Sequence, residues 1–278
     1  MNAANAIDLD AYLARIGLEA PAAAGLASLR TLIAAHLAAI PFENLDPFLG
    51  VPVALDPAAV QRKLVDHHRG GYCYEQNRLF GDVLRALGFA VTDLAARVLW
   101  GRPDDAVTAS THMLLAIELA GSTWIADVGF GGPTPTGPLR LLADVEQATP
   151  HGSYRLVRRD DGDWQLHAGA DGAWRTLYRF DLHPQFPIDY RASNYWMSTH
   201  PDSPFVGALV AARAAPGRRL ALRNCEFTVR AAEGTTSRRI LEDARAIRGV
   251  LETEFLIRLP VSPGLDSRLA RLPRESRG

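Results

Sequence analysis

Apolar positions in the first third of the chain recur every three or four residues, the period of a helix that buries one face. This pattern predicts a helix over residues 26–40, and capping residues predict a shorter one between Asp8 and Gly17. A third helix is expected to begin after Asp56, with a proline at its first position, and a fourth to span about 74–87. The first third is therefore predicted to be helical.

The period shortens between about residue 89 and about residue 186, where β-branched and aromatic residues alternate with turn signals. Within residues 154–180, the turns Asp161-Gly162 and Asp171-Gly172 separate three strand-like runs. Two such turns predict a three-stranded meander. We expect the whole region to form an antiparallel sheet or a small barrel.

The last third has a mixed pattern. Residues 203–215 are predicted to be helical, and residues 218–232 to form a strand that ends at a turn on Glu233-Gly234. An amphipathic helix is expected within residues 241–255, because its apolar residues fall on one side. The tail after Pro260 is polar and contains proline and glycine, so we expect it to be loose.

The composition is typical of a globular protein, since 47% of the 278 residues are hydrophobic and 22% are charged. A formal net charge of −1 argues against broad attraction to nucleic acid or to an anionic membrane. No apolar run approaches the roughly 20 residues of a membrane-spanning helix, and the start MNAANAIDLDAYL does not resemble a secretory signal. The 2 cysteines lie far apart, which predicts a cytoplasmic protein with free thiols.

Cys73 follows two glycines, Gly70 and Gly71, at the expected start of a helix in the segment RGGYCYEQN. Unpaired backbone N–H groups and the helix dipole favour a negative charge there, so a thiolate at this place would be a competent nucleophile. The glycines allow another backbone segment or a substrate to come close. A buried cysteine that only packs is the alternative, and this segment alone does not decide between the two.

A cysteine nucleophile needs a histidine base, which is usually held by a carboxylate or an amide. His112 begins an apolar strand, and the next strand leads to Asp127, whose carboxylate needs a partner among apolar neighbours. If Ala120-Gly121 forms a two-residue hairpin loop, Asp127 lies opposite Leu114, which shares a face with His112. The two side chains then become diagonal neighbours. A His–Asp pair that only stabilises the sheet is the alternative, but the helix-start cysteine favours a Cys-His-Asp triad.

Three segments, RGGYCYEQN, THMLL and WIADVGFGG, resemble the active-site segments of the arylamine N-acetyltransferases in order and spacing. The segment IPFENL at 40–45 also matches, and the stretch from Asn194 to Phe205 matches more loosely. The resemblance covers essentially the whole chain. It implies an α+β fold related to papain-like and transglutaminase-like Cys-His-Asp enzymes. The expected domains are a helical bundle over 1–88, an antiparallel β-barrel over 89–193, and an interdomain helix with an α/β lid over 194–278.

The resemblance also implies a reaction. Acetyl-CoA would be the donor, a cosubstrate rather than a permanently bound cofactor, and small arylamines or hydrazines would be the acceptors. Transfer would proceed by a ping-pong mechanism through acetyl-Cys73, with His112 as the base and Asp127 orienting its imidazole. No metal is expected, because no Cys/His cluster has ligand spacing. Neither nucleic acid nor a membrane is expected as a partner, and the protein is expected to be a monomer or a weak homodimer.

Binding residues are likewise implied by matching positions in the family. The donor would contact the loop that follows Asp127, at Gly129, Phe130, Gly131, Gly132 and Thr134. A glycine-rich loop can bind anions through its N–H groups, although this one lacks the ending of a Walker loop, and a simple turn is the alternative. The acceptor cleft would be lined by Phe42, Phe130 and Phe205. Aromatic walls suit a flat acceptor, and ordinary core phenylalanines are the alternative.

Three residues are expected to have structural roles only, and the triad leaves other functions open. Arg69 and Glu75 flank the nucleophile and are expected to form a structural ion pair, while Cys225 is expected only to pack. The same triad could serve a thiol hydrolase, or an amide synthase that closes a macrocycle from its own bound thioester without free acetyl-CoA. A binding protein that retains the fold without the chemistry is a further alternative.

Overall fold

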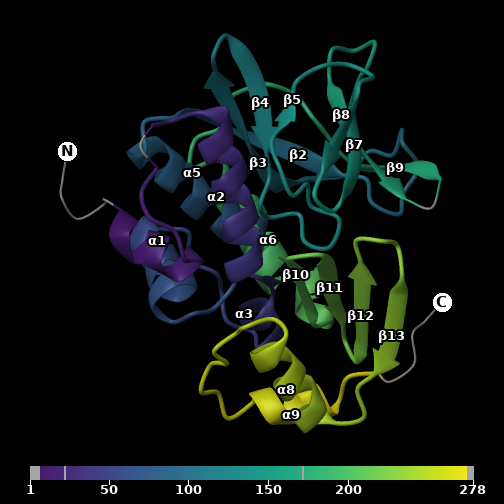
Figure 1. Cartoon of the computed structure of the whole chain (residues 1–278). Helices are drawn as coiled ribbons and strands as arrows, with labels where there is room; N and C mark the ends of the chain where they lie inside the picture. The colour runs from purple at the N-terminus through teal and green to yellow at the C-terminus, as the bar shows by residue number, and fades with distance from the viewer. Residues whose placement is uncertain (1–6, 22, 171, 274–278) are drawn as a thin grey trace.

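The computed structural model describes residues 7–21, 23–170 and 172–273 (Figure 1). The expected N-terminal helices are confirmed, because Asp8 caps the first one through the N–H of Ala11 at 2.9 Å and Gly17 ends it with φ +69°. Asp56 caps a later helix in the same way. That helix continues through a π-helical turn and ends at Asp66. The elements are α1 (Leu9–Ile16), α2 (Leu26–Ala39), α3 (Leu45–Phe48), α4 (Pro57–Gln61), η2 (Arg62–Asp66) and α5 (Cys73–Ala86).

Eight antiparallel strands form a nearly closed barrel in the order β5-β4-β3-β2-β9-β8-β7-β6. The two edge strands are joined by Gln147, whose amide accepts from the N–H of Arg140 at 2.7 Å and donates to its carbonyl at 2.8 Å. The expected meander is confirmed as β7, β8 and β9, although Asp171 in its second turn lies outside the described residues. The strands are β2 (Ala90–Val98), β3 (Ser110–Leu119), β4 (Ser122–Ala126), β5 (Leu139–Arg140), β6 (Glu146–Thr149), β7 (Gly152–Arg158), β8 (Trp164–Ala170) and β9 (Ala173–Phe180).

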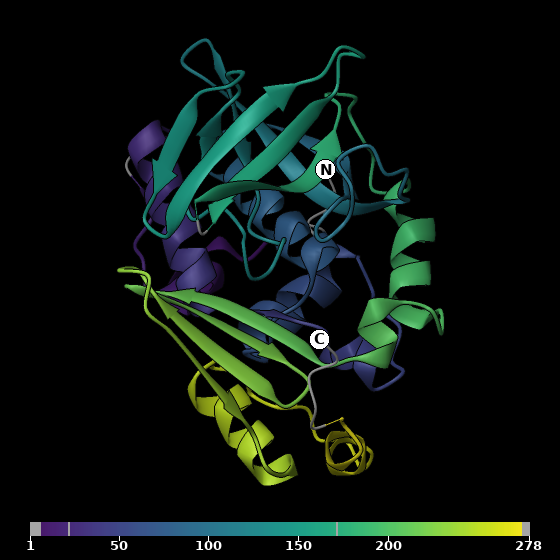
Figure 2. The same ribbon diagram turned by 90° about the vertical axis from the view of Figure 1, so that its right-hand side faces the viewer.

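A second antiparallel sheet has the order β1-β10-β11-β12-β13, and its core is shared with two C-terminal helices. Figure 2 shows this sheet below the barrel, with α6 running beside both at the right of the view. The elements are β1 (Phe42–Glu43), α6 (Tyr190–Thr199), α7 (Pro204–Gly207), β10 (Val210–Ala215), β11 (Arg218–Arg223), β12 (Glu226–Ala231), β13 (Thr236–Ile240), α8 (Ala244–Thr253) and α9 (Leu265–Ala270).

The prediction of a helix over residues 203–215 is wrong for most of that range. Only the four residues of α7 are helical, and the alanine-rich remainder forms β10. This strand pairs with β1 on one side and with β11 on the other. Pairing on both sides satisfies the backbone groups of β10, so tertiary context overrides the helix propensity of alanine.

Two further expectations for the last third are corrected. Residues 218–232 form a hairpin of two strands, with Asn224 at φ +52° in the turn between them. As far as residue 273, the tail after Pro260 is not loose, because α9 buries Leu265 and Leu269 in the core of the second sheet; the rest of the tail lies outside the described residues. Burial of two leucines holds a short segment whose polar composition predicted a loop.

The predicted α+β class, with an N-terminal helical region and a central barrel, is confirmed. The domain boundaries at 88/89 and 193/194 stay a prediction, and helix α6 crosses the second of them. Strand β1 lies in the expected N-terminal domain yet joins the C-terminal sheet. Across the described ranges, no helix combines the length and hydropathy that crossing a membrane would need.

Candidate active site

Cys73 occupies the first position of α5, directly after the extended residue Tyr72. The two preceding glycines are required by packing, since a Cβ on Gly70 would collide with the carbonyl oxygen of Pro41. A Cβ on Gly71 would lie 2.6 Å from a carboxylate oxygen of Glu75. Gly70 therefore allows another backbone segment, at Pro41, to come close, as was predicted from the sequence. The contacts of Gly70 with Pro41 and of Gly71 with Glu75 hold the start of α5 in place.

The hairpin that carries His112 and Asp127 has the expected register. Leu119 pairs with Ser122, and the loop residues Ala120 and Gly121 both have positive φ, at 49° and 70°. This register brings His112 Nε2 to 2.7 Å from Asp127 Oδ2. Both side chains are buried, so the pair excludes bulk water. The diagonal His–Asp contact predicted from the turn is confirmed as geometry.

Cys73 lies next to this pair. Its Sγ is 3.7 Å from the carbonyl oxygen of Thr111, the residue before His112. Helix α5 and strand β3 thus bring the thiol and the imidazole close together, and the neighbouring Cys73 contributes to the raised pKa of His112. The three residues predicted to form a triad meet at one place in the structure.

The charges within this cluster favour an imidazolium facing a carboxylate. Burial alone would lower the pKa of His112, but the charge of Asp127 and hydrogen bonds to Asp127 and Cys73 raise it to about 10. Burial would raise the pKa of Asp127, but the imidazolium and hydrogen bonds from Asn77 and the loop hold it below its usual value. Each partner therefore stabilises the ionised form of the other.

Asn77 orients the carboxylate of Asp127, a role that was not predicted for it from the sequence. Its Nδ2 donates to Asp127 Oδ1 at 3.0 Å and to the carbonyl of Met113 at 2.7 Å. Its Oδ1 accepts from the N–H of Val128 at 3.0 Å. A usable signal was present, since Asn77 follows Cys73 by four residues and so lies on the same face of α5.

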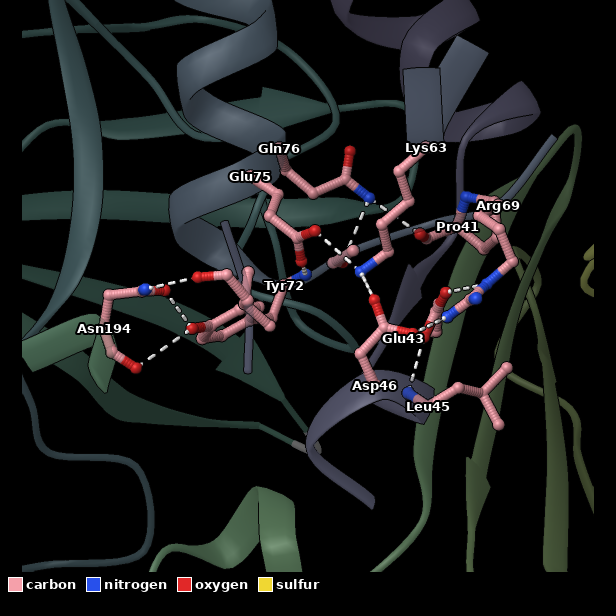
Figure 3. Close-up of polar contacts among 12 residues, drawn as sticks. Pro41, Glu43, Leu45, Asp46, Lys63, Arg69, Tyr72, Glu75, Gln76 and Asn194 are labelled. Atoms are coloured by element: carbon pink, nitrogen blue, oxygen red, sulfur yellow. Dashed lines mark hydrogen bonds and ion pairs between the residues drawn. The ribbon is translucent and has the colours of Figure 1, made fainter. Parts of the chain in front are cut away.

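A cluster of five ionisable residues lies beneath the start of α5 (Figure 3). The expected pair between Arg69 and Glu75 is wrong. Arg69 instead contacts Glu43 at 2.8 Å and Asp46 at 2.8 Å. Lys63, the single lysine of the chain, contacts Asp46 at 2.7 Å and Glu75 at 2.6 Å. We call these five residues the basal ion network.

Glu75 connects the basal ion network to the nucleophile. Its Oε2 accepts from the N–H of Tyr72, the residue before Cys73, at 3.1 Å. Burial raises the pKa of Glu75 to about 7 although the Lys63 charge opposes that rise. Burial would lower the pKa of Lys63, but the surrounding carboxylates reverse this and raise it.

The predicted aromatic residues fall into two groups. Phe42 and Phe205 pack edge to face with their ring centroids 5.8 Å apart, and Phe205 also packs on Tyr72 at 5.5 Å. Phe130 packs edge-on against the imidazole of His112, with centroids 5.2 Å apart. The ring of Phe42 also lies 3.5 Å from the place a Cβ on Gly131 would occupy, so the glycine-rich loop joins the two groups.

The loop over residues 129–134 lies directly against the nucleophile. A Cβ on Gly129 would stand 2.7 Å from Cys73 Cα, so only glycine fits at that position. Gly131 has φ +93°, a conformation that favours glycine. The hydroxyl of Thr134 donates to the backbone carbonyl of Asp127 at 2.7 Å. Three of the predicted loop residues, Gly129, Phe130 and Thr134, thus lie against Cys73, His112 and Asp127 respectively.

One small cavity lies beside the loop, and a larger one lies away from the three candidate catalytic residues. A cavity of about 10 Å³ lies between Phe42, Val128, Gly131 and residues of β10. A larger cavity of about 380 Å³ lies outside the barrel, where Arg30 of α2 and Trp124 of β4 form part of its wall. None of the three candidate catalytic residues lines that larger cavity, so the chemistry of the cluster gives the better guide to function.

Comparisons with known proteins agree with one another. A family model described as N-acetyltransferase matches residues 25–263. Arylamine N-acetyltransferase of Mycolicibacterium smegmatis is 43% identical over 94% of this chain and 96% of its own, and that of Escherichia coli is 43% identical over 89% and 88%. The solved structure of Mycobacterium marinum arylamine N-acetyltransferase in complex with CoA superposes with a TM-score of 0.91 at 41% identity, covering 95% of this chain and 99% of that chain.

Proposed function

This chain belongs to the arylamine N-acetyltransferase family of acyltransferases, and we propose that it transfers acetyl from acetyl-CoA to arylamines and hydrazines through an acetyl-cysteine. The observation that carries the proposal is the contact of 2.7 Å between His112 and Asp127 beside a cysteine at a helix start. A base held by a carboxylate is what a thiol nucleophile needs.

The first half-reaction acylates the enzyme. The Cys73 thiolate attacks the thioester carbonyl of acetyl-CoA, the bond between that carbon and the CoA sulfur breaks, and the departing sulfur takes the proton of the His112 imidazolium. The raised pKa of His112, about 10, supports a resting state in which this proton is already present. Backbone N–H groups around Cys73 are the candidate donors to the developing oxyanion.

The second half-reaction consumes the acetyl group. The amine nitrogen attacks the acetyl carbonyl, the bond to the Cys73 sulfur breaks, and His112 accepts the proton that the nitrogen loses. This proton restores the imidazolium, so each turnover returns the enzyme to its starting charge. Asp127, held by Asn77 and by the N–H of Gly129, keeps the imidazole oriented through both steps.

Aromatic side chains are proposed to hold the acceptor. Phe42 and Phe205 form one wall, and Phe130 stands against His112 on the other side. A flat aromatic amine placed between them would present its nitrogen to the base. The donor is proposed to contact Gly129, Phe130, Gly131, Gly132 and Thr134, and the solved CoA complex of the M. marinum relative supports a CoA donor.

Intact-protein mass spectrometry tests both half-reactions. Brief incubation with acetyl-CoA should add one acetyl group, peptide mapping should place it on Cys73, and an added arylamine should remove it. Lys63 is the single lysine and is tied into the basal ion network, so competing acetylation of side-chain amines is limited. Cys225, which is buried, is the internal control and should remain unmodified.

Three outcomes would overturn the proposal. An unmodified Cys73 with a free thiol would point to another acyl donor, as for an amide synthase, or to a protein without the chemistry. An acetyl group that water removes as fast as an arylamine does would point to a thiol hydrolase. A Cys73→Ala variant that still acetylates arylamines at the wild-type rate would exclude the nucleophile itself.

A further inference from the structure

Arg219 extends from β11 of the C-terminal sheet to the glycine-rich loop of the barrel. Its Nη1 donates to the carbonyl of Gly132 at 2.7 Å, and its Nη2 donates to the carbonyl of Thr134 at 2.8 Å. Nη2 also contacts the hydroxyl of Tyr154 at 2.7 Å, and Nε donates to the carbonyl of His151 at 3.3 Å. One side chain thus binds two carbonyls of the loop and a third carbonyl beside it.

The electrostatic setting of Arg219 is unusual. Within the described ranges, no carboxylate lies within ion-pair distance of its guanidinium. Burial lowers the pKa of Arg219, and the neighbouring Tyr154 only partly opposes that effect. A partly buried cation whose partners are carbonyls and one neutral hydroxyl is costly to keep, and its charge is not neutralised locally. That charge therefore remains available to an anion on the exposed side of the loop.

The loop that Arg219 holds has backbone hydrogen-bond donors that are not paired within the described structure. In the described part of the chain, the backbone N–H groups of Phe130, Gly131 and Gly132 have no hydrogen-bond acceptor. The hydroxyl of Tyr154 donates to the carbonyls of Pro133 and Thr134, at 3.0 and 3.1 Å. Arg219 and Tyr154 therefore engage the carbonyls, while consecutive N–H groups remain unpaired. Successive unpaired N–H groups near a positive charge form a favourable environment for an anion.

We propose that Arg219 is a positioning residue for the acyl donor, and this rests on the proposed function. It holds the loop over residues 129–134 in the conformation that receives the anionic part of a CoA thioester. The C-terminal sheet thereby sets the affinity for the donor, although it contributes none of the three candidate catalytic side chains. Because the loop also contacts Asp127 through Thr134, the donor site and the triad share one support.

The test compares two donors that differ in charge. Acetyl-CoA carries phosphates, whereas p-nitrophenyl acetate is a small neutral ester that can acylate the same thiolate. Arg219→Met should raise the KM for acetyl-CoA by roughly tenfold to hundredfold, the usual effect of losing hydrogen bonds to a charged group. Acylation by the neutral ester should stay within about twofold of wild type, because it does not need the anion site.

Two further variants sharpen the test. Arg219→Lys keeps the charge but loses the fork that binds two carbonyls, so it should restore part of the affinity for acetyl-CoA. Arg213→Met is the matched control, because Arg213 of β10 also donates only to carbonyls, those of Ala38 at 2.6 Å and Glu254 at 2.8 Å. It lies in the same sheet and, among the described residues, makes no hydrogen bond to the loop, so the KM of this variant for acetyl-CoA should remain at the wild-type value.

Calorimetric titration of each variant with free CoA separates this proposal from the proposed function. Unchanged CoA affinity in Arg219→Met would overturn the role of Arg219. An equal loss with both donors would also overturn it, because Arg219 would then support the triad and not the donor. A wild-type protein that binds CoA but is never acylated would defeat the proposed function alone, and the CoA affinities of the variants would still decide the role of Arg219.

Discussion

Cys73 lies next to two groups of buried ionisable side chains, and the two are built in different ways. The His112–Asp127 pair comes from one hairpin, and each charge has one opposite partner. The basal ion network takes its five residues from separate segments of the N-terminal region, and its three carboxylates outnumber its two cations. The pair is suited to moving one proton, whereas the network distributes charge and holds backbone segments together.

This difference explains the opposite behaviour of their titrating groups. In the pair, the carboxylate raises the pKa of His112 to about 10 and so keeps the imidazole charged. In the network, burial and surplus negative charge raise the pKa of Glu75 to about 7, which favours the neutral acid. One carboxylate opposite one base promotes ionisation, whereas burial beside other carboxylates opposes the ionisation of Glu75. Asp46, which contacts both Lys63 and Arg69, keeps a pKa below its usual value within the same network.

The largest effect is expected on kcat, when the His112–Asp127 pair is broken. Asp127→Asn should lower kcat by about 10³-fold to 10⁴-fold, because the amide neither stabilises the imidazolium nor fixes its tautomer. The urea midpoint of unfolding should change far less than activity does, since an amide can keep hydrogen bonds to Asn77 and the loop. Steady-state kinetics beside urea unfolding make the measurement, and a loss of activity under tenfold would contradict the role given to Asp127.

The next largest effect is expected on the unfolding free energy, when a cation of the basal ion network is removed. Arg69→Met leaves Glu43 and Asp46 without their guanidinium, and removing one partner of a buried charge pair costs about 3–5 kcal/mol of unfolding free energy. Urea denaturation measures the loss. Arg179→Met is the control, since its pairs with Asp161 and Asp163 are at the surface and should contribute at most about 1 kcal/mol. Equal losses in the two variants would show that burial of the network has no special energetic effect.

The smallest effect is expected in the pH dependence of the unfolding free energy, through the titration of Glu75. The pKa of Glu75 is raised from 4.5 to about 7 on folding, so folded protein binds more protons than unfolded protein within that window. The stabilisation from Glu75 is therefore complete at low pH and is lost as pH rises through about 7, with a slope of at most about 1.4 kcal/mol per pH unit. Glu75→Gln removes this titration.

Unfolding free energies at pH 5 and pH 8 make that measurement. Wild type should lose more stability than Glu75→Gln between the two values. His112 works in the same direction over a higher window, because its pKa rises from 6.5 to about 10 and its stabilisation is lost as pH rises through about 10. Both proteins keep His112, so the difference between them isolates Glu75. Identical pH dependence in the two proteins would argue against a neutral Glu75.

Much of the candidate site could be predicted from the sequence, and its elements show why. The helix start at Cys73 follows from glycines and helical periodicity within a short stretch. The contact between His112 and Asp127 follows from a two-residue turn and from the alternation of side chains along a strand. The wrong expectations concern choices between distant partners. The alanine-rich β10 is a strand because it pairs with β1 and β11. Arg69 forms its ion pair with Glu43 and not with Glu75.

The sequence by itself determined the features that depend on nearest neighbours along the chain: the position of Cys73 at a helix start, the hairpin register, and the glycines of the loop. Tertiary structure alone decided the partners of long charged side chains, including Arg69 in the basal ion network and Arg219 on the loop. The physical reason is reach. Turns and strand alternation act over a few bonds, whereas a guanidinium on a flexible stem can find an acceptor on any segment that folding brings within its length.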